Sequence, residues 1–103
     1  ITLYGKLGSV SVSIRAIDEL VRKGLRRFEV VKEAQIQTLT EGNRLKISAN
    51  LSVVEGWNLP ELTHVIQNEL SERLNKMLGG GVELELVVNV IKIVGEPLVE
   101  AKW

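Results

Sequence analysis

The N-terminal quarter of the chain changes from alternating to helical spacing of its apolar residues. Two short β-prone runs, 1–4 and 9–13, are joined by a segment with glycine at both ends, as a hairpin loop has. Residues 14–27 then place apolar side chains three or four positions apart, which predicts an amphipathic helix. Ser13 is the expected N-cap. Gly24 is the weak position of this helix and is expected to mark close packing against the sheet.

Two segments in the middle of the chain alternate between apolar and polar residues, as half-buried strands do. The alternation covers residues 34–39 and, more regularly, residues 45–54. Gly42 and Asn43 lie between the two segments and suit a turn. We therefore predict a β-hairpin with one wet face.

The second helix has an explicit start signal. Asn58 can cap it, and Glu61 can reach back to complete a capping box. Trp57 can pack on Leu62 as a hydrophobic staple, although Trp57 also has a second interpretation as a binding anchor. The apolar stripe continues to Leu78, and the three glycines after it predict the end of the helix.

The last apolar segment, residues 82–94, is predicted to be a strand with an unusual second half. Its first half places apolar residues on one face and polar residues on the other. Val87, Ile91 and Ile93 break the alternation because they fall on the face that should be wet. We expect another subunit, the N-terminal hairpin or the C-terminal residues to cover that face, and we take these three residues as candidate partner-binding residues.

The predicted order of elements is β-hairpin, helix, strand, strand, helix, strand. Both amphipathic helices are buried most simply on one face of a mixed sheet. The predicted fold class is therefore α/β, a two-layer sandwich of a mixed β-sheet with two amphipathic helices on one face. The 103 residues are predicted to form one domain, residues 1–94, followed by a loosely held C-terminal tail, residues 95–103.

Composition narrows the chemistry open to this domain. The chain has no Cys and one His, so we expect no disulfide, no cysteine nucleophile, no metal site and no cofactor. Thirteen basic residues balance thirteen acidic ones, which disfavours nucleic acid as a ligand. RNA-binding modules of related topology need stacking aromatics on the sheet or a GxxG loop between helices, and the sequence predicts neither. No residue spacing indicates a catalytic site, so we expect no enzyme.

The first helix is basic although the whole chain is neutral. Five cations against two carboxylates give residues 14–27 a local net charge of +3. The simple interpretation is a solvated face whose cations complement the helix dipole. The alternatives are a surface for an acidic partner, for anionic lipid or for RNA. The candidate partner-binding residues here are Arg22, Lys23, Arg26 and Arg27.

The sequence gives no sign of a membrane span of its own. Its longest stretches without a charged residue are eight residues long, whereas a span needs about 20 apolar residues. Because the chain begins with Ile1 rather than Met, we expect a domain excised from a longer protein.

Aliphatic and capping residues in several segments together carry a family resemblance. The segments are residues 10–14, 16–21, 30–34, 45–53 and 57–62, with the valine-rich last strand after them. The start of the second helix at Asn58, where an aliphatic residue, proline and glutamate follow the asparagine, is the most family-like of these. Over residues 9–93 the chain resembles the bacterial alkaline shock protein family. Its first helix is most similar to the cytoplasmic domain of the alkaline shock response membrane anchor proteins in that family.

The resemblance implies a role and a location. Membrane anchor proteins of that kind carry transmembrane segments ahead of this domain and recruit soluble family members to the membrane in Gram-positive envelope stress. The resemblance thus implies a domain that binds itself or related family members, without a cofactor. It implies a position on the cytoplasmic side of the membrane if upstream segments anchor it, and a cytoplasmic protein otherwise. Contact with the membrane would come only through segments outside this chain.

These observations together predict a non-enzymatic protein–protein association domain. More finely, they predict the cytoplasmic part of a membrane-anchored scaffold that recruits related soluble proteins in cell-envelope or alkaline stress. The alternative is a regulatory module that binds RNA or anionic lipid through the basic first helix.

Overall fold

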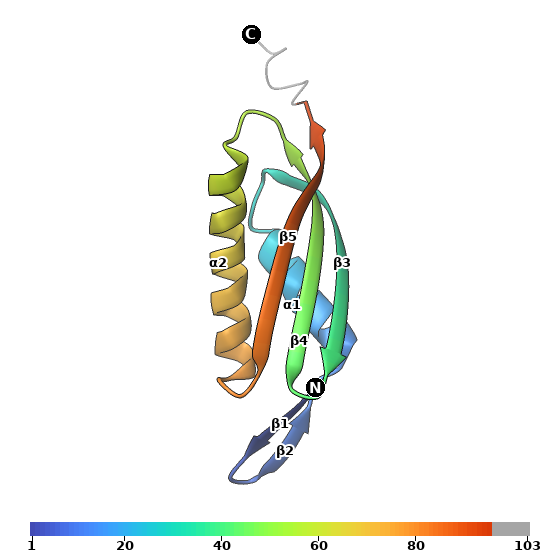
Figure 1. The fold of residues 1–103 in the computed structure, drawn as a ribbon, viewed down its shortest axis with the longest axis vertical. Helices are drawn as coiled ribbons and strands as arrows, with labels where there is room; N and C mark the ends of the chain where they lie inside the picture. Colours follow the sequence, from blue (N-terminus) through green and yellow to red (C-terminus); the bar gives the residue numbers. More distant parts are fainter. Residues whose placement is uncertain (96–103) are drawn as a thin grey trace.

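The computed structural model describes residues 1–95, whose helices and strands follow the predicted order (Figure 1). Strand β5 ends at the predicted domain boundary, and residues 96–103 of the predicted tail lie outside the described residues. The elements are β1 (Thr2–Gly5), β2 (Gly8–Ser11), α1 (Ile14–Leu25), β3 (Val31–Glu41), β4 (Arg44–Val54), α2 (Leu59–Leu78) and β5 (Glu83–Val94).

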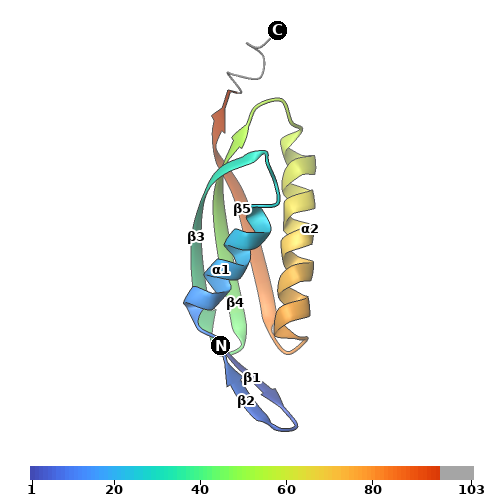
Figure 2. The ribbon, with the colours of Figure 1, turned by 180° about the vertical axis from the view of Figure 1, so that it is seen from behind.

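Strands β3, β4 and β5 form a mixed sheet with β4 in the centre. Strands β3 and β4 are antiparallel, whereas β4 and β5 are parallel and are connected through α2. Helix α1 packs over β3, α2 packs over β5, and the helices contact each other on the same face of the sheet (Figure 1, Figure 2). The predicted two-layer α/β sandwich is confirmed.

The core lies between the sheet and the helices because each element has one apolar side. From Arg44 to Leu51 of β4 every second side chain enters the core, while polar side chains alternate with them on the other face; the last residues, Ser52 to Val54, are all buried. The helices contribute residues three and four positions apart, as the predicted stripes require. The buried set includes Leu45, Ile47, Ala49, Leu51 and Val53 of β4, Ile17, Val21 and Leu25 of α1, and Leu62, Ile66, Leu70, Leu74 and Leu78 of α2.

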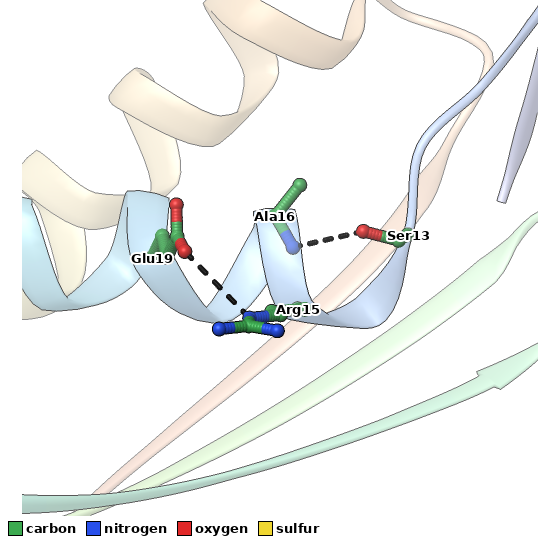
Figure 3. A network of polar contacts seen from close by, with 4 residues as sticks. All are labelled: Ser13, Arg15, Ala16 and Glu19. Atoms are coloured by element: carbon green, nitrogen blue, oxygen red, sulfur yellow. Dashed lines mark hydrogen bonds and ion pairs between the residues drawn. The ribbon is translucent and has the colours of Figure 1, made fainter.

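Helix α1 begins at the predicted cap and ends earlier than predicted. The Ser13 side-chain oxygen accepts a hydrogen bond from the Ala16 N–H at 3.1 Å (Figure 3). The helix ends at Leu25 rather than at the predicted Arg27. The helix is followed here by a 3₁₀-type turn, in which the Arg27 N–H donates to the Gly24 carbonyl three residues back, at 3.3 Å.

Gly24 packs against α2 rather than against the sheet. A Cβ atom on Gly24 would lie 2.6 Å from Cδ2 of Leu70 and 3.4 Å from Cδ of Arg73, both on α2. The missing side chain therefore allows the two helices to cross closely. Close packing was predicted correctly, but the predicted partner, the sheet, was wrong.

Both ends of α2 follow their local sequence signals. Oδ1 of Asn58 accepts a hydrogen bond from the Glu61 N–H at 3.1 Å, and Pro60 lies in the first turn. At the other end Gly79 has φ 79°, a left-handed conformation that favours glycine.

The N-cap of α2 provides a test of this local signal. Asn58→Ala is expected to lower the free energy of unfolding by about 1 kcal/mol, because a helix N–H loses its acceptor. Asn58→Asp keeps an acceptor and is expected to change the stability by only about 0.3 kcal/mol. Urea denaturation of both variants measures the difference. An equal loss in both would contradict the capping role.

The β1–β2 hairpin is a separate two-stranded sheet. Leu3 lies opposite Val10, as the predicted hairpin requires. Ile1 and Val12 exchange backbone hydrogen bonds of 2.7 and 3.0 Å at the base, and both pack against the core. The tip projects away from the end of the molecule at which α1 begins (Figure 1).

Candidate functional site

The predicted partner-binding residues lie on two surfaces, at the C-terminal end of α1 and along β5. Within residues 1–95, no group of three or more His, Asp or Glu side chains could hold a metal ion. In the same residues, no helix has the length and apolar character needed to cross a bilayer.

The α1 basic surface consists of four exposed cations at the C-terminal end of this helix. Nη1 of Arg22 donates a hydrogen bond to the Ala34 carbonyl of β3 at 3.4 Å. None of the four forms an ion pair with a carboxylate in the described part of the chain, whereas Arg15 pairs with Glu19 at 3.9 Å (Figure 3). Their charges are therefore not neutralised by described residues. The surface comprises Arg22, Lys23, Arg26 and Arg27.

A β-bulge in β5 changes the face on which its last residues lie. Val90 is opposite Leu51 of β4. The next residue of β4, Ser52, is opposite Lys92, so Ile91 is an extra residue. An extra residue shifts every later side chain of the strand to the other face relative to a simple alternation.

The bulge corrects the predicted position of Ile93. Val87 lies opposite Ser48 on the face that the helices leave open, as predicted. Ile93 lies opposite Val53, which is a buried core residue. Ile93 is therefore on the helix-covered side of the sheet and not on the wet face, and extending the period-two pattern through the bulge was wrong.

Ile93 is exposed although it lies on the helix-covered side, because β5 is longer than the helix that packs on it. A short turn joins α2 to β5, and the two run back alongside each other (Figure 1). The 20 residues of α2 span about 30 Å, whereas the 12 residues of β5 span about 40 Å. The strand consequently extends past the helix, and Ile91 and Ile93 are 56% and 55% exposed. The N-terminal hairpin, one of the predicted covers, lies at the opposite end of the molecule (Figure 1).

The outer edge of β5 is covered at one point and open farther along. No strand pairs with this edge within residues 1–95. Nε2 of Gln67, on α2, donates a hydrogen bond to the Leu86 carbonyl at 2.7 Å. No comparable side-chain hydrogen bond caps a backbone group of β5 beyond Leu86 in the described residues. We call Ile91, Ile93 and this open edge the β5 end.

The sequence did not predict a groove beside the start of α2. Phe28 and Arg27 line one side, Trp57 and Val65 line the other, and the hollow has a volume of about 430 Å³. Trp57 remains 58% exposed, so its ring is largely open to solvent even though Leu62, its predicted staple partner, lines the same groove. Trp57, already interpreted as a possible binding anchor, was a sequence signal for this groove. Phe28 lies far from Trp57 in the sequence, so the sequence alone did not bring the two residues together.

The hairpin tip is a second feature that the sequence did not single out. Its strands were predicted, but Tyr4, Leu7 and Val10 are all largely exposed. Alternation alone does not show that a strand pair lies away from the main core.

Comparison with known proteins identifies a fold and no family. Neither a family model nor a curated protein matches this chain. Among solved structures, the metal-bound C-terminal domain of the CzcD transporter from Thermotoga maritima is similar, with a TM-score of 0.64 and 17% sequence identity. The match covers 81% of this chain and 94% of that chain. At this identity the likeness shows the fold alone, and the resemblance to the alkaline shock protein family stays a prediction from the sequence.

Proposed function

We propose that this chain is a non-enzymatic protein–protein association domain and that it associates through the β5 end. The observation that carries the proposal is the open edge of β5 beside two isoleucines that are each more than half exposed. An edge strand presents unpaired N–H and C=O groups, and proteins usually protect such an edge with charge, proline or a covering segment. Apolar side chains beside an open edge therefore favour a partner that covers both.

The proposed partner is a second copy of this chain or a related family member. The resemblance to alkaline shock proteins over residues 9–93 supports this choice. The zero formal net charge also supports it, because two such domains approach without strong mutual repulsion. In this proposal the domain is the cytoplasmic part of a membrane-anchored scaffold that recruits related soluble proteins in cell-envelope or alkaline stress. Segments outside this chain would provide the anchor.

Light scattering of the purified chain, alone and mixed with a soluble alkaline shock protein, tests the association. We expect the mass of a dimer or of a mixed complex. The double variant Ile91→Lys/Ile93→Lys is expected to weaken association at least about tenfold, because two charges replace apolar contact area. The matched control Tyr4→Lys/Val10→Lys alters two exposed apolar residues of the hairpin and is expected to leave association unchanged.

Each outcome of this experiment bears on a different part of the proposal. Strictly monomeric behaviour with no mixed complex would reject the association function. Equal weakening by the hairpin control would reject the β5 end as the surface. Self-association without a mixed complex would retain the association domain and reject recruitment of family members.

A second candidate function uses the α1 basic surface. Its four exposed cations have no ion pair in the described part of the chain, which favours an anionic ligand. The alternative function is therefore a regulatory module that binds RNA or anionic lipid. Binding of an RNA oligonucleotide and of phosphatidylglycerol vesicles at physiological salt tests it, with Arg22→Glu/Arg26→Glu as the charge-reversed variant. Absence of binding by the wild-type chain would eliminate this function.

A further inference from the structure

A small cleft lies where α1 crosses α2, outside the β5 end. It has a volume of about 260 Å³. Gly24 and Arg27 contribute from the α1 side, and the other charged lining residues come from α2. We call it the Arg73 cleft, and its charged lining consists of Arg27, Arg73, Lys76, Glu69 and Glu72.

Arg73 is held in this cleft by the close approach of the two helices. Its Cδ and Nε atoms lie 3.4 and 3.8 Å from the position that a Cβ on Gly24 would occupy. The stem of Arg73 therefore packs beside Gly24 of α1 at ordinary van der Waals distance, while the closer approach that requires glycine is that of Leu70. This packing fixes the side chain better than an exposed arginine on a single helix would be fixed.

The guanidinium of Arg73 has an unsatisfied donor. Its Nε atom is buried and has no hydrogen-bond partner among residues 1–95. A buried donor without a partner is uncommon in folded proteins, and one on a charged group is especially costly. Packing therefore encloses the Nε end of the guanidinium, and the two terminal nitrogens, which are not buried and form no hydrogen bond among residues 1–95, are the donors that a ligand in the cleft can reach.

The cations of the cleft are not neutralised by neighbouring acids. Glu69 and Glu72 precede Arg73 and Lys76 by four residues, the spacing that favours ion pairs along a helix. Neither pair is formed within 4.0 Å in the described part of the chain, and Arg27 likewise has no ion pair there. The cleft thus gathers three cations that form no ion pair in the described part of the chain.

We propose that the Arg73 cleft binds a carboxylate side chain from an acidic segment of a partner protein. Arginine presents its donors as a planar fork that matches a carboxylate, and the cleft is of a size for one such group. Glu69 and Glu72 in its lining restrict the basic area to a small site, and the chain has zero net charge, whereas a polyanionic phosphate backbone or a lipid surface needs a wide basic field. This inference rests on the proposed association function and adds the chemistry of a second contact surface.

Nitrogen-15 NMR of the full chain tests the inference, because the arginine Nε–H group gives its own signal. The probe is a peptide of six glutamates, with inorganic phosphate, phosphatidylglycerol vesicles and an RNA oligonucleotide as separate arms. We expect the peptide to shift the Arg73 Nε–H signal saturably and more weakly as salt rises, while the signal of the exposed Arg15 stays in place. Arg73→Lys keeps the charge but loses the fork, and is expected to weaken peptide binding about tenfold or more. Arg15→Lys is the matched control and is expected to bind as the wild type does.

The outcomes separate this inference from the proposed function. An unmoved Arg73 signal, or equal weakening by Arg15→Lys, would overturn the carboxylate site. Stronger binding of phosphate, vesicles or RNA than of the peptide would also overturn it. Because Arg73→Lys leaves the β5 end intact, its light-scattering mass is expected to match that of the wild type. Failure of the peptide titration with normal association would leave the proposed function standing, whereas monomeric behaviour with normal peptide binding would reject only the proposed function.

Discussion

Gly24→Ala is expected to destabilise the wild-type domain but to stabilise a domain that already carries Leu70→Ala. In the wild type the added Cβ would lie 2.6 Å from Cδ2 of Leu70. Leu70 is 1% exposed and belongs to the core, so this methyl group has little room to move away. Overpacking of this kind costs about 1–3 kcal/mol, while replacing a glycine inside a helix contributes about 1 kcal/mol. We therefore expect the free energy of unfolding to fall by about 1 kcal/mol.

The sign reverses in the Leu70→Ala background. Leu70→Ala alone is expected to cost about 2–5 kcal/mol, because it leaves a cavity in the core. It also removes the atom that the new Cβ would meet, so that Gly24→Ala then contributes only its helix propensity, about 1 kcal/mol. Urea denaturation of the wild type, both single variants and the double variant measures the coupling. The same sign in both backgrounds would show that Gly24 is not required by its contact with Leu70.

The parts of the fold that the sequence predicted best depend on short-range interactions. The N-caps at Ser13 and Asn58 each join a side chain to an N–H three residues later, so the whole interaction is visible in four consecutive residues. The alternation of β4 is equally local, because this central strand buries one face over most of its length. These elements were predicted with nearly correct ends for that reason.

The parts that were missed depend on register between distant segments. The bulge at Ile91 exists only relative to β4, and nothing in the sequence of β5 shows that one residue is extra. The partner of Gly24 was wrong for a related reason, because the helix sequence does not show whether a glycine faces a sheet or another helix. Both errors come from non-local geometry, which hydrophobic periodicity does not carry.

The candidate surfaces also differ in whether the sequence alone reveals them. A cluster of cations close together in the sequence, such as Arg26 and Arg27, is apparent without a structure. The sequence does not set Arg73 apart, since Glu69 four residues earlier has the spacing of an ordinary helix ion pair. Only the placement of Arg73 over Gly24 shows that its Nε is buried and lacks that partner.

The contrast between Ile47 and Ile93 gives the second large expected effect. Ile47→Ala is expected to lower the free energy of unfolding by about 2–5 kcal/mol at every protein concentration, because this side chain is 0% exposed within the domain. Ile93→Ala is expected to cost less than about 0.5 kcal/mol in dilute protein, where the 55% exposed side chain has little packing to lose. Both residues are isoleucines on the helix-covered side of one sheet. The comparison therefore isolates how burial of the side chain changes the stability cost of its removal.

Concentration then distinguishes a covered β5 end from a bare one. If partner copies bind Ile93, association stabilises the folded wild type by mass action, and this stabilisation grows with protein concentration. The cost of Ile93→Ala is therefore expected to rise between dilute and concentrated samples, while the cost of Ile47→Ala stays constant. Chemical denaturation of both variants at two protein concentrations a hundredfold apart measures this difference. When the partner copy is in excess, a hundredfold change in its concentration changes the stabilisation of the folded state by about 2.7 kcal/mol. A cost of Ile93→Ala that does not depend on concentration would mean that Ile93 has no partner copy over it, and would count directly against the β5 end as the association surface.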